Sequence, residues 1–316
     1  MGPPSFPENM SDLTSPLRYP GSKSFLADYF EKVIEESMLT GCHFYAPCAG
    51  GASLSLCLLA RDAVSRVTLV EKDPLIYAFW RCVVTRPDDL CEKIEGLRVN
   101  IATWKKFQPY LGSNARRDND ILDLGLAGFF FNRANFSGII GAKPIGGMKQ
   151  ESDYKIDCRF NRGRLIAAIC RIAKLRERIS VRCGDAVAFL RSREAKIASE
   201  HSLVYVDPPY FKQGPKLYRY HYTERQHVEL AQFLNPAGFR WIVSYDDHPF
   251  IRRNFGDQEI IPIFLNYAVK QSRKASELLI ANFRVRQPSV EDAAGESVTK
   301  DVNLAAISPG RLRVCR

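Results

Sequence analysis

The 316-residue chain is 46% hydrophobic and carries a formal net charge of +10, from 45 Lys and Arg against 35 Asp and Glu. This length and apolar content support one large folded domain, or a domain with an insertion, and exclude a disordered chain. The positive charge favours an anionic partner such as nucleic acid. Nine cysteines without a CxxC pair and five scattered histidines predict no metal site and indicate a reduced, cytoplasmic setting.

Both ends of the chain differ in composition from its middle. Residues 1–16 are turn-rich, and residues 287–316 mix Pro, Gly, Ser and acids with little periodicity. We predict a flexible N-terminal arm and a disordered C-terminal tail. The start lacks a basic segment followed by an apolar core, and no apolar run reaches the roughly 20 residues of a membrane span. We therefore expect a protein that is not exported and has no membrane partner.

After the arm, the segment RYPGSKSFL places Tyr19, Gly21 and Lys23 before a helical stretch. Lys23 could hold a ligand carboxylate there, although the stretch alone is equally a turn followed by a helix cap. Short β-prone runs then alternate with helical patterns, in the order HFYAPC, ASLSLCLLARDA, VTLVE and PLIYAFWRCVV. Further strands are predicted at ISVRC, LVYVD, RWIVSY, EIIPIFL and LLIANF. This order predicts an α/β fold with a doubly wound, mostly parallel sheet.

A mainly helical stretch interrupts this alternation at residues 87–175. It contains DILDLGLAGFFFNRA and NRGRLIAAICRIAKLRER around the Gly-rich loop SGIIGAKPIGGMKQ. Eleven Lys or Arg and only four acids lie between Gly141 and Cys183. We predict an inserted subdomain that serves a polyanionic partner and divides a catalytic domain into residues 17–86 and 176–286. The alternative is that these charges only solvate a helix face.

The first predicted strand ends in APCAGGAS, which contains Pro47, Gly50 and Gly51. Glycines at such a turn let the backbone approach a ligand at a helix N-terminus. Glu71 ends the next strand, 20 residues beyond Gly51. At that spacing an acid meets ribose hydroxyls in dinucleotide-type folds, although a solvated acid at a strand end is the alternative. Because the full GxGxxG pattern is missing, a nucleoside-containing ligand is favoured over NAD.

The segment LVYVDPPYF carries the Asp207 carboxylate to the carboxyl edge of the sheet, where ligands bind in open α/β folds. Pro208 and Pro209 fix the backbone after it, and Tyr210 presents a flat ring suited to stacking on a planar base. Asp207 and a backbone carbonyl can accept the hydrogens of an exocyclic amine, so these four residues are the candidate catalytic residues. A plain turn at a strand end is the structural alternative.

Taken together and in this order, the motifs resemble those of the Dam-type DNA adenine-N6 methyltransferases, which use S-adenosylmethionine. RYPGSK, APCAGGAS, VEKD, VYVDPPY and ELLIAN are similar to the family's motifs, and FFFNRANFSGI and YKIDCRFN to segments around its target-recognition region. The resemblance spans roughly Leu17 to Phe283. The chain departs from it at Ala46, Cys48 and Ala52, where the family usually has an acid, a phenylalanine and a further glycine.

The resemblance implies a Rossmann-like methyltransferase sheet and methyl transfer to N6 of an adenine flipped out of duplex DNA, with S-adenosylhomocysteine as product and no metal. It implies a bacterial or phage protein, with a companion restriction endonuclease acting separately. Asp207, Pro208 and Tyr210 would hold the adenine. The cofactor would contact Tyr19, Lys23, Gly50, Gly51, Glu71 and Asp185. Candidate DNA contacts are Arg116, Arg117, Asn132, Arg133, Lys143 and Lys149.

Two other functions stay open at this point. The methylated amine could belong to RNA or to cytosine N4, although Asp before PPY favours adenine. Alternatively, the altered glycine motif would suit a catalytically silent module that binds nucleic acid through its basic insertion.

Overall fold

The computed structural model describes residues 13–19, 21–112, 120–265 and 275–287. Most of the predicted arm, residues 1–12, and the tail from 288 onward lie outside this range. The prediction of a loose arm is wrong for residues 13–16, because Leu13 is only 2% exposed and packs in the core together with Leu17. No helix in the described ranges is long and apolar enough to cross a membrane.

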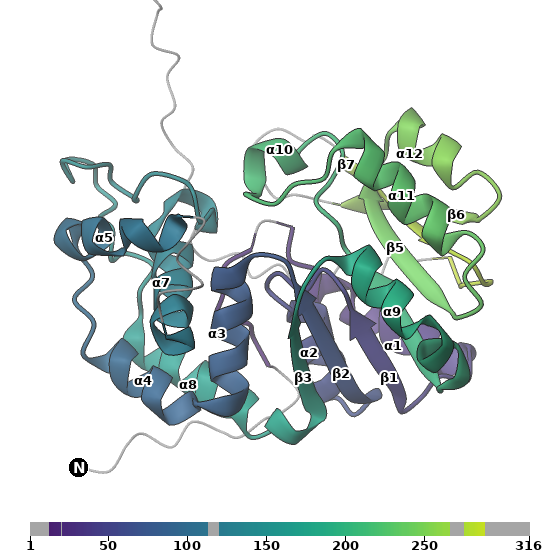
Figure 1. The fold of residues 1–316 in the computed structure, drawn as a ribbon, viewed down its shortest axis with the longest axis horizontal. Coiled ribbons are helices and arrows are strands. Elements are labelled where there is room, and N and C mark those ends of the chain that lie inside the picture. The colour runs from purple at the N-terminus through teal and green to yellow at the C-terminus, as the bar shows by residue number, and fades with distance from the viewer. Residues whose placement is uncertain (1–12, 20, 113–119, 266–274, 288–316) are drawn as a thin grey trace, which may run out of the picture.

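Within the described part of the chain, seven strands form one sheet in the order β3-β2-β1-β4-β5-β7-β6 (Figure 1). The strands are β1 (Cys42–Ala46), β2 (Val64–Glu71), β3 (Ile179–Cys183), β4 (Ser202–Val206), β5 (Trp241–Asp246), β6 (Glu259–Leu265) and β7 (Ala275–Ala281). Neighbouring strands in the series β3-β2-β1-β4-β5 are parallel, and β7 runs antiparallel to both β5 and β6. The predicted strands and the mostly parallel sheet are confirmed. The strand order reverses between β1 and β4, the position at which such sheets bind ligands.

Helices cover both faces of the sheet, because side chains along each strand point alternately to opposite faces. Tyr205 of β4 packs in the core with α1 (Ala27–Glu36), α2 (Ser53–Ala60) and α3 (Pro74–Thr85). Its neighbour Val204 packs in a second core with α9 (Ala186–Ser199), α11 (Glu224–Leu234) and α12 (Pro249–Asn254). Shorter turns are η1 (Ser24–Leu26), η4 (Arg176–Arg178) and α10 (Gly214–Leu217). The doubly wound arrangement is therefore confirmed.

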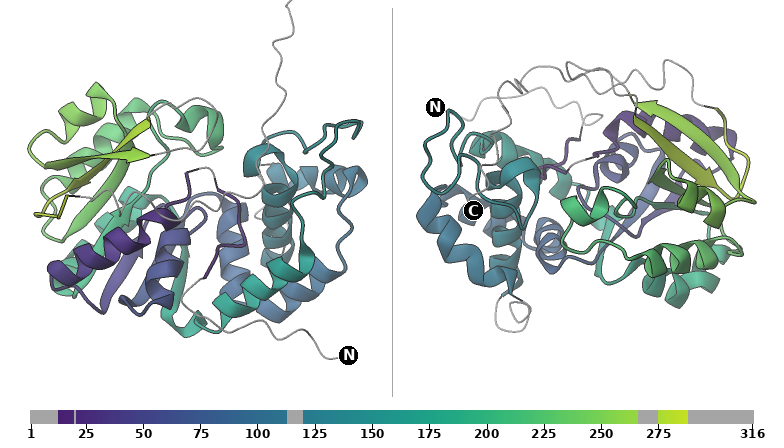
Figure 2. Two further views of the ribbon diagram at one scale, coloured as in Figure 1. Left: turned by 180° about the vertical axis from the view of Figure 1, so that it is seen from behind. Right: turned by 90° about the horizontal axis from the view of Figure 1, so that it is seen from above.

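The chain between α3 and β3 is mainly helical, as predicted, and lies at one side of the sheet (Figure 2). It forms α4 (Pro87–Glu95), α5 (Ile101–Phe107), η2 (Gln108–Leu111), α7 (Ile121–Ala134), η3 (Phe136–Gly138) and α8 (Arg162–Ala173). Helix α7 packs along α3, where the rings of Phe79 and Phe129 stack with centroids 5.4 Å apart. Because its apolar residues belong to the core of one sheet face, this helical region is anchored to the catalytic half.

The packing of α7 on α3 predicts a stability effect at Gly128. A Cβ there would lie 2.5 Å from the carbonyl oxygen of Leu75, so the two helix backbones would have to separate. We expect Gly128→Ala to lower the free energy of unfolding by about 1–3 kcal/mol, measured by urea denaturation. Gly163→Ala in α8 is the control, since a Cβ there meets nothing within 4 Å. Equal stability of the two variants would contradict this packing.

Candidate active site

A cleft opens at the carboxyl ends of β1, β2 and β4, where the strand order reverses. Its lining also includes Tyr19, residues 21–23 and most of residues 217–222, which lie far apart in the sequence. The predicted site residues that line it are Tyr19, Gly21, Lys23, Pro47, Gly50, Gly51, Glu71, Asp207 and Pro209. Asp185 directly precedes the lining residue Ala186. Pro208 lies between the lining residues Asp207 and Pro209, and Tyr210 directly follows them. Residues far apart in the sequence are thus brought to one site.

The glycine turn after β1 is fixed by hydrogen bonds at both polar groups of Gly50. Its N–H donates to Glu71 Oε2 at 2.8 Å, and its carbonyl accepts from the indole N–H of Trp80 at 2.8 Å. Gly50 has a φ of +47°, and a Cβ there would lie 3.0 Å from the ring of Tyr19. Ala52 also has a positive φ, of 52°, at the N-terminus of α2. Both the positive φ and the close approach of the Tyr19 ring therefore favour glycine at position 50.

Glu71 closes β2 and holds the turn in place. Its second oxygen, Oε1, accepts from the backbone N–H of Asp73 at 2.8 Å. Burial raises the pKa of the Glu71 carboxyl to about 7, against the lowering effect of the N–H groups that it accepts from. The cleft therefore contains a carboxyl that changes charge near neutral pH.

An aromatic wall from residues 217–222 faces the glycine turn across the cleft. Tyr218 stacks on Tyr19 with ring centroids 5.9 Å apart. Arg219 donates to the carbonyl of Leu111 at 3.0 Å and lies 3.7 Å from the carboxylate of Asp73. This wall was not predicted, since the segment has neither helical nor strand periodicity.

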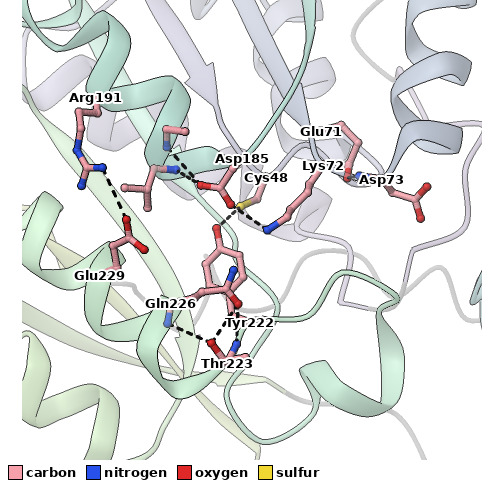
Figure 3. Close-up of polar contacts among 12 residues, drawn as sticks. Cys48, Glu71, Lys72, Asp73, Asp185, Arg191, Tyr222, Thr223, Gln226 and Glu229 are labelled. Atoms are coloured by element: carbon pink, nitrogen blue, oxygen red, sulfur yellow. Dashed lines mark hydrogen bonds and ion pairs between the residues drawn. The ribbon is translucent and has the colours of Figure 1, made fainter. Parts of the chain in front are cut away.

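The far end of the cleft is bounded by an ion pair and a tyrosine (Figure 3). Asp185 caps α9 by accepting from the N–H groups of residues 187 and 188, and its Oδ2 lies 3.0 Å from Lys72 Nζ. Lys72 Nζ in turn lies 5.9 Å from the ring centroid of Tyr222, whose hydroxyl is 4.0 Å from Cys48 Sγ. Asp185 is thus already engaged by the protein, and its predicted contact with a cofactor adenine stays a prediction.

Asp207 extends from β4 at the centre of a polar network. Its Oδ1 accepts from the hydroxyl of Ser244 at 2.7 Å and lies 3.5 Å from Lys23 Nζ. Ser244 is also 2.9 Å from the hydroxyl of Tyr205. The hydrogen bond from Ser244 and the closest approach of Lys23 both fall on Oδ1, and no described residue donates a hydrogen bond to Oδ2. One carboxylate oxygen is therefore held and the other can accept from a ligand.

Glu277, a buried residue of β7, belongs to the same network and was not predicted from the sequence. Its Oε2 accepts from the hydroxyl of Tyr210 at 2.7 Å and lies 3.5 Å from Lys23 Nζ. Lys23 is also buried, and its ammonium lies 4.9 Å from the ring centroid of Tyr210. Because protein carboxylates share this ammonium, its predicted role with a ligand carboxylate stays a prediction.

The predicted DNA contacts have different surroundings. Asn132 is 0% exposed, and its amide bonds the backbone of Arg18 and Gly138. Assigning Asn132 to DNA is therefore wrong in this structure, because its side chain ties two segments together. Arg133 is half-buried and donates to the carbonyl of Arg159. Lys143 and Lys149 are exposed, and Arg116 and Arg117 lie outside the described residues.

The doubly wound sheet and the cleft define an α/β protein with a cofactor-type site beyond its strand ends. Residues 19–269 match the model of the D12 class N6 adenine-specific DNA methyltransferases, and the chain belongs to this family. No match was found among curated proteins. The family resemblance seen in the motifs is thereby confirmed.

Two solved structures are similar at low identity. One is the tRNA methyltransferase TrmK of B. subtilis, with 11% identity and a TM-score of 0.33. The match covers 83% of this chain and 66% of the TrmK chain, which is just under two thirds of the length of TrmK. The other is the rRNA methyltransferase aviRa of Streptomyces viridochromogenes, with 14% identity and a TM-score of 0.35, covering 88% and 93%.

Family membership identifies the protein as an S-adenosylmethionine-dependent methyltransferase, and the cleft fits that cofactor. The side chains nearest to Gly50 and Gly51 are those of Tyr19 and Ser53, and the Glu71 carboxyl lies at the end of β2, where ribose hydroxyls are bound in such folds. In the described ranges, no group of three or more His, Cys, Asp or Glu side chains could hold a metal ion.

Proposed function

We propose that this protein transfers a methyl group from S-adenosylmethionine to N6 of an adenine in duplex DNA. The observation that carries the proposal is Asp207, which lines the cofactor cleft. One of its carboxylate oxygens accepts from Ser244, and no described residue donates a hydrogen bond to the other. The family name supports adenine N6 as the acceptor. The net charge of +10 supports a polyanionic substrate.

In this proposal the protein's own residues hold and polarise the acceptor amine. S-adenosylmethionine supplies the methyl group on a sulfonium sulfur. Asp207 accepts one hydrogen of the amine, which increases electron density at the nitrogen and stabilises the positive charge that develops during attack. Tyr210 provides an aromatic surface beside the base, and stacking of this kind contributes about 1–3 kcal/mol per base. This offsets much of the few kcal/mol that flipping the base costs.

Tritium-labelled methyl incorporation from S-adenosylmethionine tests the proposal. The wild type and Asp207→Ala are incubated with unmethylated genomic DNA and, in parallel, with unmodified total RNA, followed by mass analysis of nucleosides. We expect N6-methyladenine in DNA with the wild type only. Label in RNA or in N4-methylcytosine would reassign the substrate. No incorporation together with salt-sensitive DNA binding would favour the silent binding module.

The loop that follows Tyr210 predicts a further effect on the reaction. Asp246, at the end of β5, accepts from the backbone N–H groups of Phe211 and Lys212, both at 2.9 Å. We expect Asp246→Ala to slow methyl transfer by roughly 10–100-fold by releasing this turn, since small misplacements of a catalytic group are costly. Asp246→Asn keeps one acceptor and should be intermediate in single-turnover assays. Wild-type rates in both variants would show that the turn holds its position without Asp246.

A further inference from the structure

We propose that Glu277 is a positioning residue for methyl transfer, which neutralises Lys23 so that the Asp207 carboxylate stays available to the acceptor amine. The inference rests on the proposed function and concerns a residue outside the DPPY segment. Glu277 lies more than 60 residues beyond that segment in the sequence, on a different strand.

The geometry around Lys23 carries the inference. Its Nζ donates to the carbonyl oxygen of Gly21 at 2.7 Å and lies 3.5 Å from both Asp207 Oδ1 and Glu277 Oε2, so the two carboxylates lie at equal distances from one cation. Lys23 and Glu277 are both buried, whereas Asp207 is 28% exposed and lines the cleft. The buried carboxylate can therefore remain with the lysine while the more exposed one binds a ligand.

The charge balance explains why a second carboxylate is needed. A buried ammonium is stabilised by nearby negative charge, and the Gly21 carbonyl carries none, so removing the Glu277 carboxylate would strengthen the pull of Lys23 on Asp207. Asp207 would then be drawn toward the lysine, and its negative charge would interact with the ammonium instead of with the acceptor amine. With Glu277 present, Lys23 keeps a carboxylate close by when Asp207 turns to the substrate.

Glu277 has a second contact that needs separate testing. The hydroxyl of Tyr210 donates to Glu277 Oε2 at 2.7 Å, so the carboxylate also fixes the ring beside the base. Gln at position 277 keeps an oxygen that can accept from this hydroxyl but removes the charge. Tyr210→Phe does the reverse, because it removes the hydrogen bond and keeps the charge. The two variants therefore separate the electrostatic role from the orienting role.

Single-turnover methyl transfer to DNA and calorimetric titration with S-adenosylmethionine test the inference. We expect Glu277→Gln to slow transfer by roughly 10–100-fold, with the Kd for S-adenosylmethionine within about threefold of wild type. The loss of transfer rate in Tyr210→Phe should be at least about fivefold smaller than the loss in Glu277→Gln. The matched control is Glu259→Gln on β6, an acid at the opposite end of the antiparallel pair, paired in register with Ala281. Its rate should stay within about twofold of wild type.

A double-mutant cycle identifies Lys23 as the intermediary. If Glu277 acts through Lys23, adding Glu277→Gln to a Lys23→Met background should change the rate by less than about threefold. Full additivity of the two losses, or a wild-type rate for Glu277→Gln, would overturn the inference while the proposed function stands. A wild type that methylates no DNA would remove the proposed function and the inference together. Thermal unfolding of each variant separates these outcomes from loss of folding.

Discussion

Replacing Asp207 with asparagine is expected to slow methyl transfer by about 100–1000-fold while leaving the Kd for S-adenosylmethionine within about threefold of the wild-type value. The reason is chemical, because asparagine is neutral and cannot stabilise positive charge developing on the amine as a carboxylate does. Asp207 does not contribute to the glycine turn, which is held by Glu71 and Trp80. Single-turnover rates and calorimetric titration measure the two quantities separately.

Asp257→Asn is a suitable control for this prediction, because Asp257 is exposed and is not part of the cleft lining. It should retain the wild-type rate. An Asp207→Asn rate within about tenfold of wild type would show that amine activation does not depend on the carboxylate charge. A large loss of cofactor affinity would place Asp207 in the cofactor site instead.

Replacing Glu71 with alanine should affect both stability and cofactor binding. The N–H groups of Gly50 and Asp73 would lose their acceptor, which costs about 1–3 kcal/mol for each buried donor left unpaired. We expect a Kd for S-adenosylmethionine weakened by roughly 10–100-fold, the loss of one or two charge-assisted hydrogen bonds. Urea denaturation and calorimetry measure these effects. Glu35→Ala, at an exposed position of α1, is the control, and equal behaviour of the two variants would contradict the role of Glu71.

The raised pKa of Glu71 gives this prediction a pH dependence. Burial raises the pKa from 4.5 to about 7, so the folded protein without cofactor favours the neutral carboxyl. The stability from this group is fully present below pH 4.5 and is lost as the pH rises through about 7. Cofactor binding should change in the opposite direction, because the ionised form is the better acceptor for ribose hydroxyls. The Kd should therefore be lower at about pH 8 than at about pH 6, and this difference should vanish in Glu71→Gln.

Much of the site was predictable because its motifs follow strands directly. Gly50, Glu71 and Asp207 each lie at a strand end, and in a parallel sheet such ends meet at one edge. The local sequence therefore predicted both the strand and the candidate site residue at or after its end. The wall at residues 217–222 could not be found in this way, because loop positions depend on packing against distant segments.

Glu277 was hidden for a topological reason. β7 is inserted between β5 and β6 and runs antiparallel, which places its first residues at the edge where the parallel strands end. A parallel strand would carry Glu277 to the opposite edge. Nothing in ELLIAN specifies this pairing locally, so the acid at its start was read only as part of a strand.

Asn132 was misassigned although its helical position indicates burial. Gly128 and Asn132 follow Gly125 by three and seven residues along α7, so the three residues share one helix face. Gly125 and Gly128 allow that face to approach the backbone of α3 closely. A polar side chain on such a stripe is expected to hydrogen-bond inside the protein, as Asn132 does with Arg18 and Gly138.

The late position of β7 also matters during synthesis on the ribosome. The cofactor turn and the DPPY segment are translated by residue 210, yet the carboxylate that shares Lys23 follows only at residue 277. Until that strand enters the sheet, β5 lacks its neighbour on one side and β6 has no partner to join it. A nascent chain can therefore form the cofactor half of the site well before it has the charge arrangement for transfer. Among the described strands β7 is translated last, so under our proposal the charge arrangement for transfer is completed only with this strand.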